Sequence, residues 1–282
     1  MNSLKTTILL ASLTGIIVFL GYYLGGQNGA LLALLISVVM NFGSYWFSDK
    51  IVLSLYKAKE ITRESNPSLH EMIEELSQKA NLPKPRLYLV DLPVPNAFAT
   101  GRNENNAVVA VSSGILTLLS KEELRGVLAH ELSHIKNKDI LISSVAATLA
   151  GAISYLSQMA YFSGGLSGDD GNRKGAGFGG LLFLILTPII ATLLNLAVSR
   201  SREYMADETG SNISKDPMSL ATALKKLGDF SHTHPVQAGP RHEATAHLFI
   251  VNPFKSSFLA SLFSTHPPTE ERIKKLENLK LS

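Results

Sequence analysis

The chain has 282 residues, of which 17% are charged and 45% hydrophobic, and its formal net charge at neutral pH is +3. Its 26 basic residues are nearly balanced by 23 acidic ones, which argues against the strongly basic surface that nucleic-acid binding requires. There is no cysteine, which excludes disulfides and thiolate metal sites and fits a reducing compartment.

Residues 1–48 predict a helical hairpin that crosses a membrane. Between Lys5 and Asp49 there is no charged residue and no histidine, a run of 43 residues. A single helix of that length would measure about 65 Å, twice the roughly 30 Å hydrocarbon core of a bilayer. The glycine-rich segment at 25–29 marks a turn in its middle. We therefore expect two spans. A cleavable signal peptide is disfavoured, because a second apolar segment follows and no clear small-residue cleavage site is present.

Residues 49–139 have the pattern of a small domain that combines helices with a short sheet. Pro67 begins an amphipathic helix. Three strands are expected, at residues 86–90, 97–100 and 107–111. Ser120 and Glu123 have the spacing of a capping box, and apolar residues recur at helical spacing behind them. The expected fold is therefore mainly α with a small β-sheet, an α+β arrangement.

The helix that begins after Ser120 contains His-Glu-Leu-Ser-His at residues 130–134. Residues four apart share one face of a helix, so the imidazoles of His130 and His134 can bind one metal ion. Glu131 then lies beside that ion, where its carboxylate can accept a proton from a bound water molecule. The pattern is typical of a zinc hydrolase.

A second pair of spans is expected within residues 140–199. Segments 140–168 and 175–199 contain no charged residue. The second is apolar and long enough to cross a bilayer, whereas the first has several polar side chains and could instead be a helix buried in a soluble domain. We expect the motif helix to continue directly into the first. Segments 48–139 and 200–282 hold twelve and eleven of the 26 basic residues, which predicts four spans with both termini and the metal site in the cytoplasm.

The third metal ligand is expected where the chain returns to the cytoplasm after the fourth span. Glu203 lies just beyond that point and can supply a carboxylate oxygen. Asp207, one helical turn further on, can accept a hydrogen bond from the outer ring nitrogen of a ligating histidine. A Glu-x-x-x-Asp pair of this kind is typical of gluzincin peptidases. The alternative is that Glu203 is an ordinary interfacial charge.

Several other interpretations fit the sequence less well. A metzincin needs glycine and histidine where Asn137 and Ile140 stand. An intramembrane protease would bury its motif within a span, whereas this motif precedes the apolar segment and has charged neighbours. A membrane chaperone would not need Glu131 beside a complete ligand set, and a transporter would need ionisable groups inside its spans.

Three blocks resemble the signature motifs of the M48 metallopeptidases, in the family's order along the chain. They are His-Glu-Leu-Ser-His-Ile-Lys-Asn-Lys-Asp at 130–139, Ser-Arg-Ser-Arg-Glu-Tyr-Met-Ala-Asp at 199–207, and Ser-Thr-His-Pro-Pro-Thr-Glu-Glu-Arg-Ile at 264–273. With Asn-Ala-Phe-Ala-Thr-Gly at 96–101 and the hairpin, the similarity covers essentially the whole chain. It implies a membrane-bound zinc endopeptidase in which one Zn²⁺ ion is held by His130, His134 and Glu203.

The resemblance also implies a setting and further site residues. The substrates would be misfolded or damaged membrane proteins, cleaved during stress at the cytoplasmic face of the cell (inner or plasma) membrane. Asn96 and Ala97 would lie on an edge strand that binds substrate through backbone hydrogen bonds. His266 would either donate to the oxyanion of the tetrahedral intermediate or fix the final helix. The oligomeric state stays open.

Two helices are expected in the rest of residues 200–282. Asp216 and Pro217 begin one, which Gly228 is expected to end. The other runs from about residue 268 to 279. Between them, the histidines of segment 232–247 lie in a region that could be a flexible loop. A second metal site there would rest on His-x-His alone, which is a weak signal.

Overall fold

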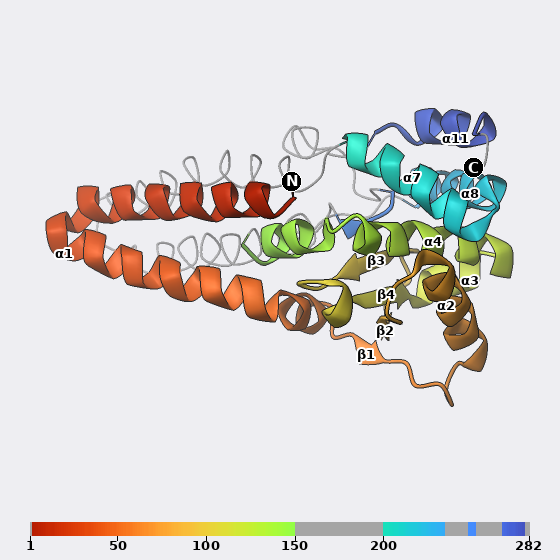
Figure 1. The fold of residues 1–282 in the computed structure, drawn as a ribbon, viewed down its shortest axis with the longest axis horizontal. Helices are drawn as coiled ribbons and strands as arrows, with labels where there is room; N and C mark the ends of the chain where they lie inside the picture. Colours follow the sequence, from red (N-terminus) through yellow and green to blue (C-terminus); the bar gives the residue numbers. More distant parts are fainter. Residues whose placement is uncertain (1, 150–199, 235–247, 252–266, 280–282) are drawn as a thin grey trace, which may run out of the picture.

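Figure 1 shows a helical hairpin that projects from a body made of the remaining helices and one small sheet. The computed structural model describes residues 2–149, 200–234, 248–251 and 267–279. The hairpin is the element α1 (Asn2–Leu55), whose backbone leaves the helical conformation at Gly25 and Gly26. Gly26 has φ +58°, a conformation that glycine adopts without steric cost. The turn expected at residues 25–29 is therefore present.

The two arms of α1 meet at the bend and spread apart toward the body (Figure 1). Near the bend, a Cβ added at Gly21 or Gly29 would overlap the backbone of the opposite arm, so glycine permits this close approach. Further along, the Asn41 side-chain amide donates to the Thr14 hydroxyl across 2.8 Å. This hydrogen bond joins two of the polar side chains on a mainly apolar hairpin.

The second arm, Gly25–Leu55, is the one helix among the described residues that is long and apolar enough to cross a membrane. It has 31 residues, its most apolar 18-residue window has a mean hydropathy of 1.8, and most of its side chains face outward. The first arm contains a shorter apolar stretch, Leu10–Tyr23, and Ile140–Leu149 forms another. The rest of the expected second pair of spans, residues 150–199, lies outside the described residues.

The sheet has four strands in the order β1-β2-β4-β3. They are β1 (Lys59–Glu60), β2 (Arg86–Val90), β3 (Ala97–Thr100) and β4 (Val108–Ser112). The central pair β2 and β4 is parallel, and the outer strands pair antiparallel to them. The three expected strands are confirmed to within one residue, and β1 was not expected. β3 is an edge strand of this sheet.

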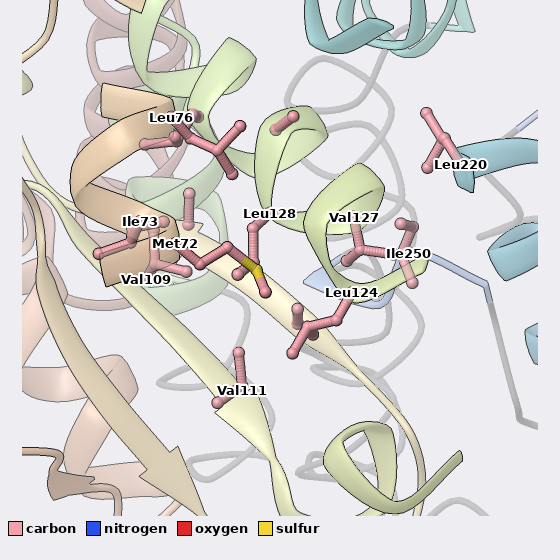
Figure 2. Close-up of a cluster of buried hydrophobic side chains, with 14 of the residues drawn as sticks. Met72, Ile73, Leu76, Val109, Val111, Leu124, Val127, Leu128, Leu220 and Ile250 are labelled. Atoms are coloured by element: carbon pink, nitrogen blue, oxygen red, sulfur yellow. The ribbon is translucent and has the colours of Figure 1, made fainter. Parts of the chain in front are cut away.

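The helices of the body pack in layers on the sheet. They are α2 (Pro67–Ala80), α3 (Ser113–Leu118), α4 (Lys121–Lys136), α7 (Arg200–Ser214), α8 (Pro217–Thr233) and α11 (Thr269–Glu277), with a 3-10 turn η1 (Glu104–Asn106). Figure 2 shows the core where α2, β4 and α4 meet, with Met72, Val109 and Leu128 among its buried side chains. α4 is central, because it touches the sheet on one side and α7 and α8 on the other.

Two expectations about helix boundaries are wrong. The motif helix does not continue into the next apolar segment: α4 ends at Lys136, and Lys138 adopts a left-handed φ of +59° before a new helix starts at Ile140. The break returns the chain toward the end of α4. Gly228 does not end α8, which continues to Thr233, because packing against α11 outweighs the weak helix propensity of one glycine.

Candidate metal centre

The metal motif lies on α4, and local sequence explains its helical form. The Ser120 side chain accepts a hydrogen bond from the Glu123 amide, and the Glu123 side chain accepts one from the Ser120 amide, so the expected capping box is present. α7 packs closely on this helix, since a Cβ at Gly210 would overlap the backbone of His130. The Ser133 hydroxyl also lies 3.1 Å from the Ala206 carbonyl of α7. These contacts, from the middle of α7, place that helix against the motif.

His130, His134 and Glu203 meet at this α4–α7 contact, with their ligand atoms all within 4.8 Å of one another. The two histidine Nε2 atoms are 3.2 Å apart. Glu203 carboxylate oxygens lie 3.7 Å from Nε2 of His130 and 3.6 Å from Nε2 of His134. Ligands bound tetrahedrally at the usual zinc–nitrogen length would be separated by about 3.3 Å. The three predicted ligands thus have nearly the spacing that zinc requires.

The outer nitrogen of each histidine faces a carboxylate. Nδ1 of His130 lies 3.0 Å from Asp207, as the sequence predicted, and Nδ1 of His134 lies 3.2 Å from Asp139. Such a partner favours the tautomer with its proton on Nδ1, which leaves Nε2 free to bind a metal. Both imidazoles are therefore oriented for the same task.

Asp139 and Arg272 are members of this site that the sequence reasoning missed. Asp139 reaches His134 only because the chain breaks at Lys138. Arg272, on α11, is 1% exposed and donates two hydrogen bonds to Asp207, at 2.9 and 2.7 Å. Although burial opposes it, Arg272 holds the pKa of Asp207 well below its usual range. Their positions inside the two outer family blocks were the available signal.

The electrostatics of the centre favour a cation. Burial would lower the pKa of His134, but the carboxylates of Asp139, Glu203 and Glu131 outweigh it and raise that pKa to about 10. Four buried carboxylates, those three and Asp207, surround the two imidazoles and outnumber the two buried arginines beside them, Arg202 and Arg272. Such an excess of negative charge stabilises a divalent ion there, which would displace the histidine proton.

Glu131 lies beside the ligands but does not belong to them. It is 5% exposed, and its Oε2 accepts a hydrogen bond from the Ala99 amide across 2.8 Å. Burial raises the pKa of its carboxyl, which the charges of the two histidines oppose only in part. A carboxylate that is desolvated and oriented in this way is suited to accept a proton.

Residues 248–250 form a roof over the metal centre. The cavity beneath it has a volume of about 40 Å³, and Leu248, Phe249 and Ile250 are among its lining residues. The Asn96 side chain accepts a hydrogen bond from the Ile250 amide at 3.1 Å and donates to the Leu248 carbonyl at 3.4 Å. Arg272 donates to the Ile250 carbonyl at 3.1 Å. The cavity has room for a water molecule or two but not for a peptide.

The remaining predicted site residues have mixed outcomes. Ala97 begins the edge strand β3, next to Asn96. His266 lies outside the described residues, as does most of segment 232–247. His234, at the end of α8, stacks on Phe230 with ring centroids 4.6 Å apart. Within the part of the chain that the structure describes, the His130 group is the only cluster of three or more such side chains with metal-binding spacing.

Comparison with known proteins agrees with this geometry. The profile of peptidase family M48 matches residues 63–280. A "Protease HtpX homolog" of Persephonella marina is 55% identical, with 98% of this chain and 96% of the relative covered. A protein of the same name from Pyrococcus furiosus is 51% identical over 98% and 95% of the two chains.

Among solved structures, the crystal structure of S. mikatae Ste24p has a similar fold, with a TM-score of 0.52 and 18% identity. It covers 98% of this chain, which spans only 65% of the Ste24p chain. The resemblance to the M48 metallopeptidases, expected from three sequence blocks, is thus confirmed over nearly the whole length of the chain. The chain belongs to peptidase family M48.

Proposed function

We propose that this protein is a zinc-dependent endopeptidase, with one ion held by His130, His134 and Glu203. The observation that carries the proposal is the ligand geometry, in which two nitrogens and a carboxylate converge beside the buried carboxylate of Glu131. Names of relatives that denote proteases support it.

Each residue of the site would have a separate role in the hydrolysis. Bound zinc would polarise the scissile carbonyl and lower the pKa of a water molecule. Glu131 accepts a proton from that water molecule while the water oxygen bonds to the carbonyl carbon. Glu131 later delivers the proton to the amine nitrogen as the C–N bond breaks. Asp207 and Asp139 keep the two imidazoles aligned throughout. His266 remains a candidate donor to the oxyanion.

Substrate binding would use β3, whose outer edge faces the metal centre. The Ala99 amide points toward Glu131 rather than to β4, so a peptide laid beside Asn96 and Ala97 as an added strand would pass the catalytic carboxylate. Residues 248–250 stand in that path. Entry of a peptide therefore requires the roof, with its hydrogen bonds to Asn96, to move aside.

The proposed setting is a membrane. Residues 1–48 and 140–199 would form the spans, and segments 49–139 and 200–282 the cytoplasmic peptidase, with both termini on that side. The apolar second arm of α1 and the basic residues that follow it support this orientation. Misfolded or damaged membrane proteins would then be substrates that meet the site close to the bilayer of the cell membrane.

The decisive experiment compares purified wild-type protein with Glu131→Gln on a denatured membrane-protein substrate. We expect wild-type cleavage to be abolished by a chelator and restored by zinc, whereas Glu131→Gln binds one zinc ion and does not cleave. Glu122→Gln, the same change on the exposed first turn of α4, is the matched control and should remain active. Chelator-resistant cleavage, or cleavage by Glu131→Gln, would contradict the proposal.

A further inference from the structure

A second pocket lies at the opposite end of the sheet from α3, where α1 meets the body. Its volume is about 530 Å³, and its lining includes Trp46, Phe47, Lys50, Arg86, Arg102 and Asn105. None of these residues belongs to the metal centre. The pocket combines exposed aromatic rings with several cationic side chains, and nothing in the proposed peptide hydrolysis uses it.

The charges in this pocket are predominantly positive. Arg102 stands over the Trp46 ring at 4.5 Å from its centroid, and Lys50 over the Phe47 ring at 5.7 Å. Arg86 pairs with Asp49 at 3.0 Å, which leaves the other two cations without a carboxylate partner in the lining. Three cations therefore face a single carboxylate. Arg102 Nη2 donates to the Asn106 side chain at 3.3 Å, also in the lining, and an arginine stacked on an indole keeps its remaining N–H groups available for hydrogen bonds to a phosphate.

The position of the pocket along α1 indicates that it lies at the membrane surface. The second arm has 31 residues, about 46 Å of helix, and so exceeds a bilayer core by roughly 16 Å. Asp49 and Lys50 are the first charged residues after the apolar run, so the segment Asp49–Leu55 supplies about 10 Å of this excess at the pocket end. Phe42, Trp46 and Phe47 directly precede them and remain exposed. Aromatic rings just inside the first charges are characteristic of the bilayer interface.

Packing fixes the body at that depth. Val52 and Leu53, one turn beyond the pocket, are buried against Phe98 and Val108 of the sheet. Arg86 begins β2 and Arg102 follows β3, so both arginines are carried to the helix end by the sheet. The cationic side chains are therefore held beside the interface by the fold and do not depend on a mobile loop.

We propose that this pocket binds the phosphate headgroup of an anionic phospholipid. Arg102 and Lys50 would contact the phosphate, the Asn105 amide can donate to it, and Trp46 and Phe47 would lie against the upper acyl chain. Asp49 stays neutralised by Arg86. The excess of positive charge favours a lipid with net negative charge over a zwitterionic one. The proposal rests on the membrane placement in the proposed function, but it is independent of catalysis.

The chain contains a single tryptophan, Trp46, so its fluorescence reports on this pocket alone. Full-length Glu131→Gln protein, which avoids self-cleavage, is placed in vesicles of equal phosphatidylglycerol and phosphatidylcholine. Bromine is carried on the acyl chains of one lipid or of the other, at identical overall composition. We expect quenching to be roughly twofold stronger when bromine is on phosphatidylglycerol.

Substitutions of Arg102 test whether the preference for phosphatidylglycerol arises at this pocket. Arg102→Gln should bring the quenching ratio toward one, and Arg102→Lys should keep part of it. Lys121→Gln, the same loss of charge at the far end of α4, should leave the ratio unchanged (Figure 1). Because each ratio compares two samples of one variant, loss of the arginine–indole contact does not distort it. If Arg102→Gln fails to fold by circular dichroism, Lys50→Gln takes its place.

Three results would overturn the proposal. A ratio of one in the parent protein would show that no headgroup is selected, including the case in which only free phosphate binds. Equal ratios in Arg102→Gln and the parent, or equal losses in Arg102→Gln and Lys121→Gln, would reduce the effect to general surface charge. Absence of quenching by either lipid would also refute the membrane placement of α1, whereas a failed cleavage assay would leave the lipid result standing.

Discussion

Replacing Arg272 by methionine should destabilise the protein far more than loss of an ordinary ion pair. Arg272 is 1% exposed, bonds Asp207 through two hydrogen bonds and lies 3.6 Å from Glu203. Methionine fills similar space but removes both hydrogen bonds to the buried Asp207 carboxylate and one cation beside Glu203. Removal of one partner from a buried ion pair costs about 3–5 kcal/mol. For a chain of this size, we expect the thermal unfolding midpoint of the metal-free protein to fall by roughly 5–9 °C.

A pair of nearly the same length whose cation is exposed, and whose carboxylate keeps its hydrogen bond from the Ser120 amide, provides the control. Lys226 and Glu123 are 2.8 Å apart, but the lysine side chain is 47% exposed, so Lys226→Met should cost only about 0.2–1 kcal/mol. Both variants are unfolded by heat in detergent, with circular dichroism as the signal, with chelator and with zinc. Zinc should recover more stability in Arg272→Met than in Lys226→Met, since it supplies positive charge beside the buried carboxylates that Arg272 contacts. Equal and small losses in the two variants would refute this reasoning.

Three further outcomes are expected. Asp139→Asn should weaken zinc binding about 10–100-fold, as measured by competition with a chelating dye. Asp91→Asn, on the surface, is the control and should not change the affinity. Equal zinc affinities of the two variants would show that Asp139 does not orient the His134 imidazole. Gly29→Leu should lower the unfolding midpoint by forcing the arms of α1 apart, at a cost of about 1–3 kcal/mol, and an unchanged midpoint would refute the close contact. Pairing with Arg125 lowers the pKa of Glu75 to about 2, so the pair's stabilisation, about 0.5 kcal/mol at this exposed site, should be complete above pH 4.5 and vanish as pH falls toward 2. Unfolding of wild type and Arg125→Gln at both pH values checks this, and a difference that persists at pH 2 would contradict it.

The parts of the site that lie within one element were predictable. His130, Glu131 and His134 depend only on helical periodicity and on the capping box that begins α4. Glu203 and Asp207 were predicted by a weaker argument, that the chain returns to the motif after an apolar pair. The structure places both on α7 against α4, although residues 150–199, which carry the connection, are outside the described part.

Expectations about where helices continue or end, which rested on local sequence alone, were wrong at two positions. A helix through residues 136–140 satisfied local propensity, yet the chain adopts a left-handed turn at Lys138. That turn has a modest local cost, and it brings a buried Asp139 to the His134 imidazole, an interaction that no local pattern reports. Gly228 was expected to end α8 for the same kind of local reason, and tertiary packing prevailed there as well.

The sequence by itself determined the helix that carries His-Glu-Leu-Ser-His, the position of Glu131 beside the two histidines, the apolar hairpin and the family. These follow from spacing along one helix and from runs of apolar residues, which act over a few turns. Only the tertiary structure decided which distant groups complete the centre. Arg272 meets Asp207 across 65 positions, and Asn96 holds the Leu248 carbonyl of the roof across 152. Contacts at such separation depend on how whole elements pack, so no local pattern in the chain encodes them.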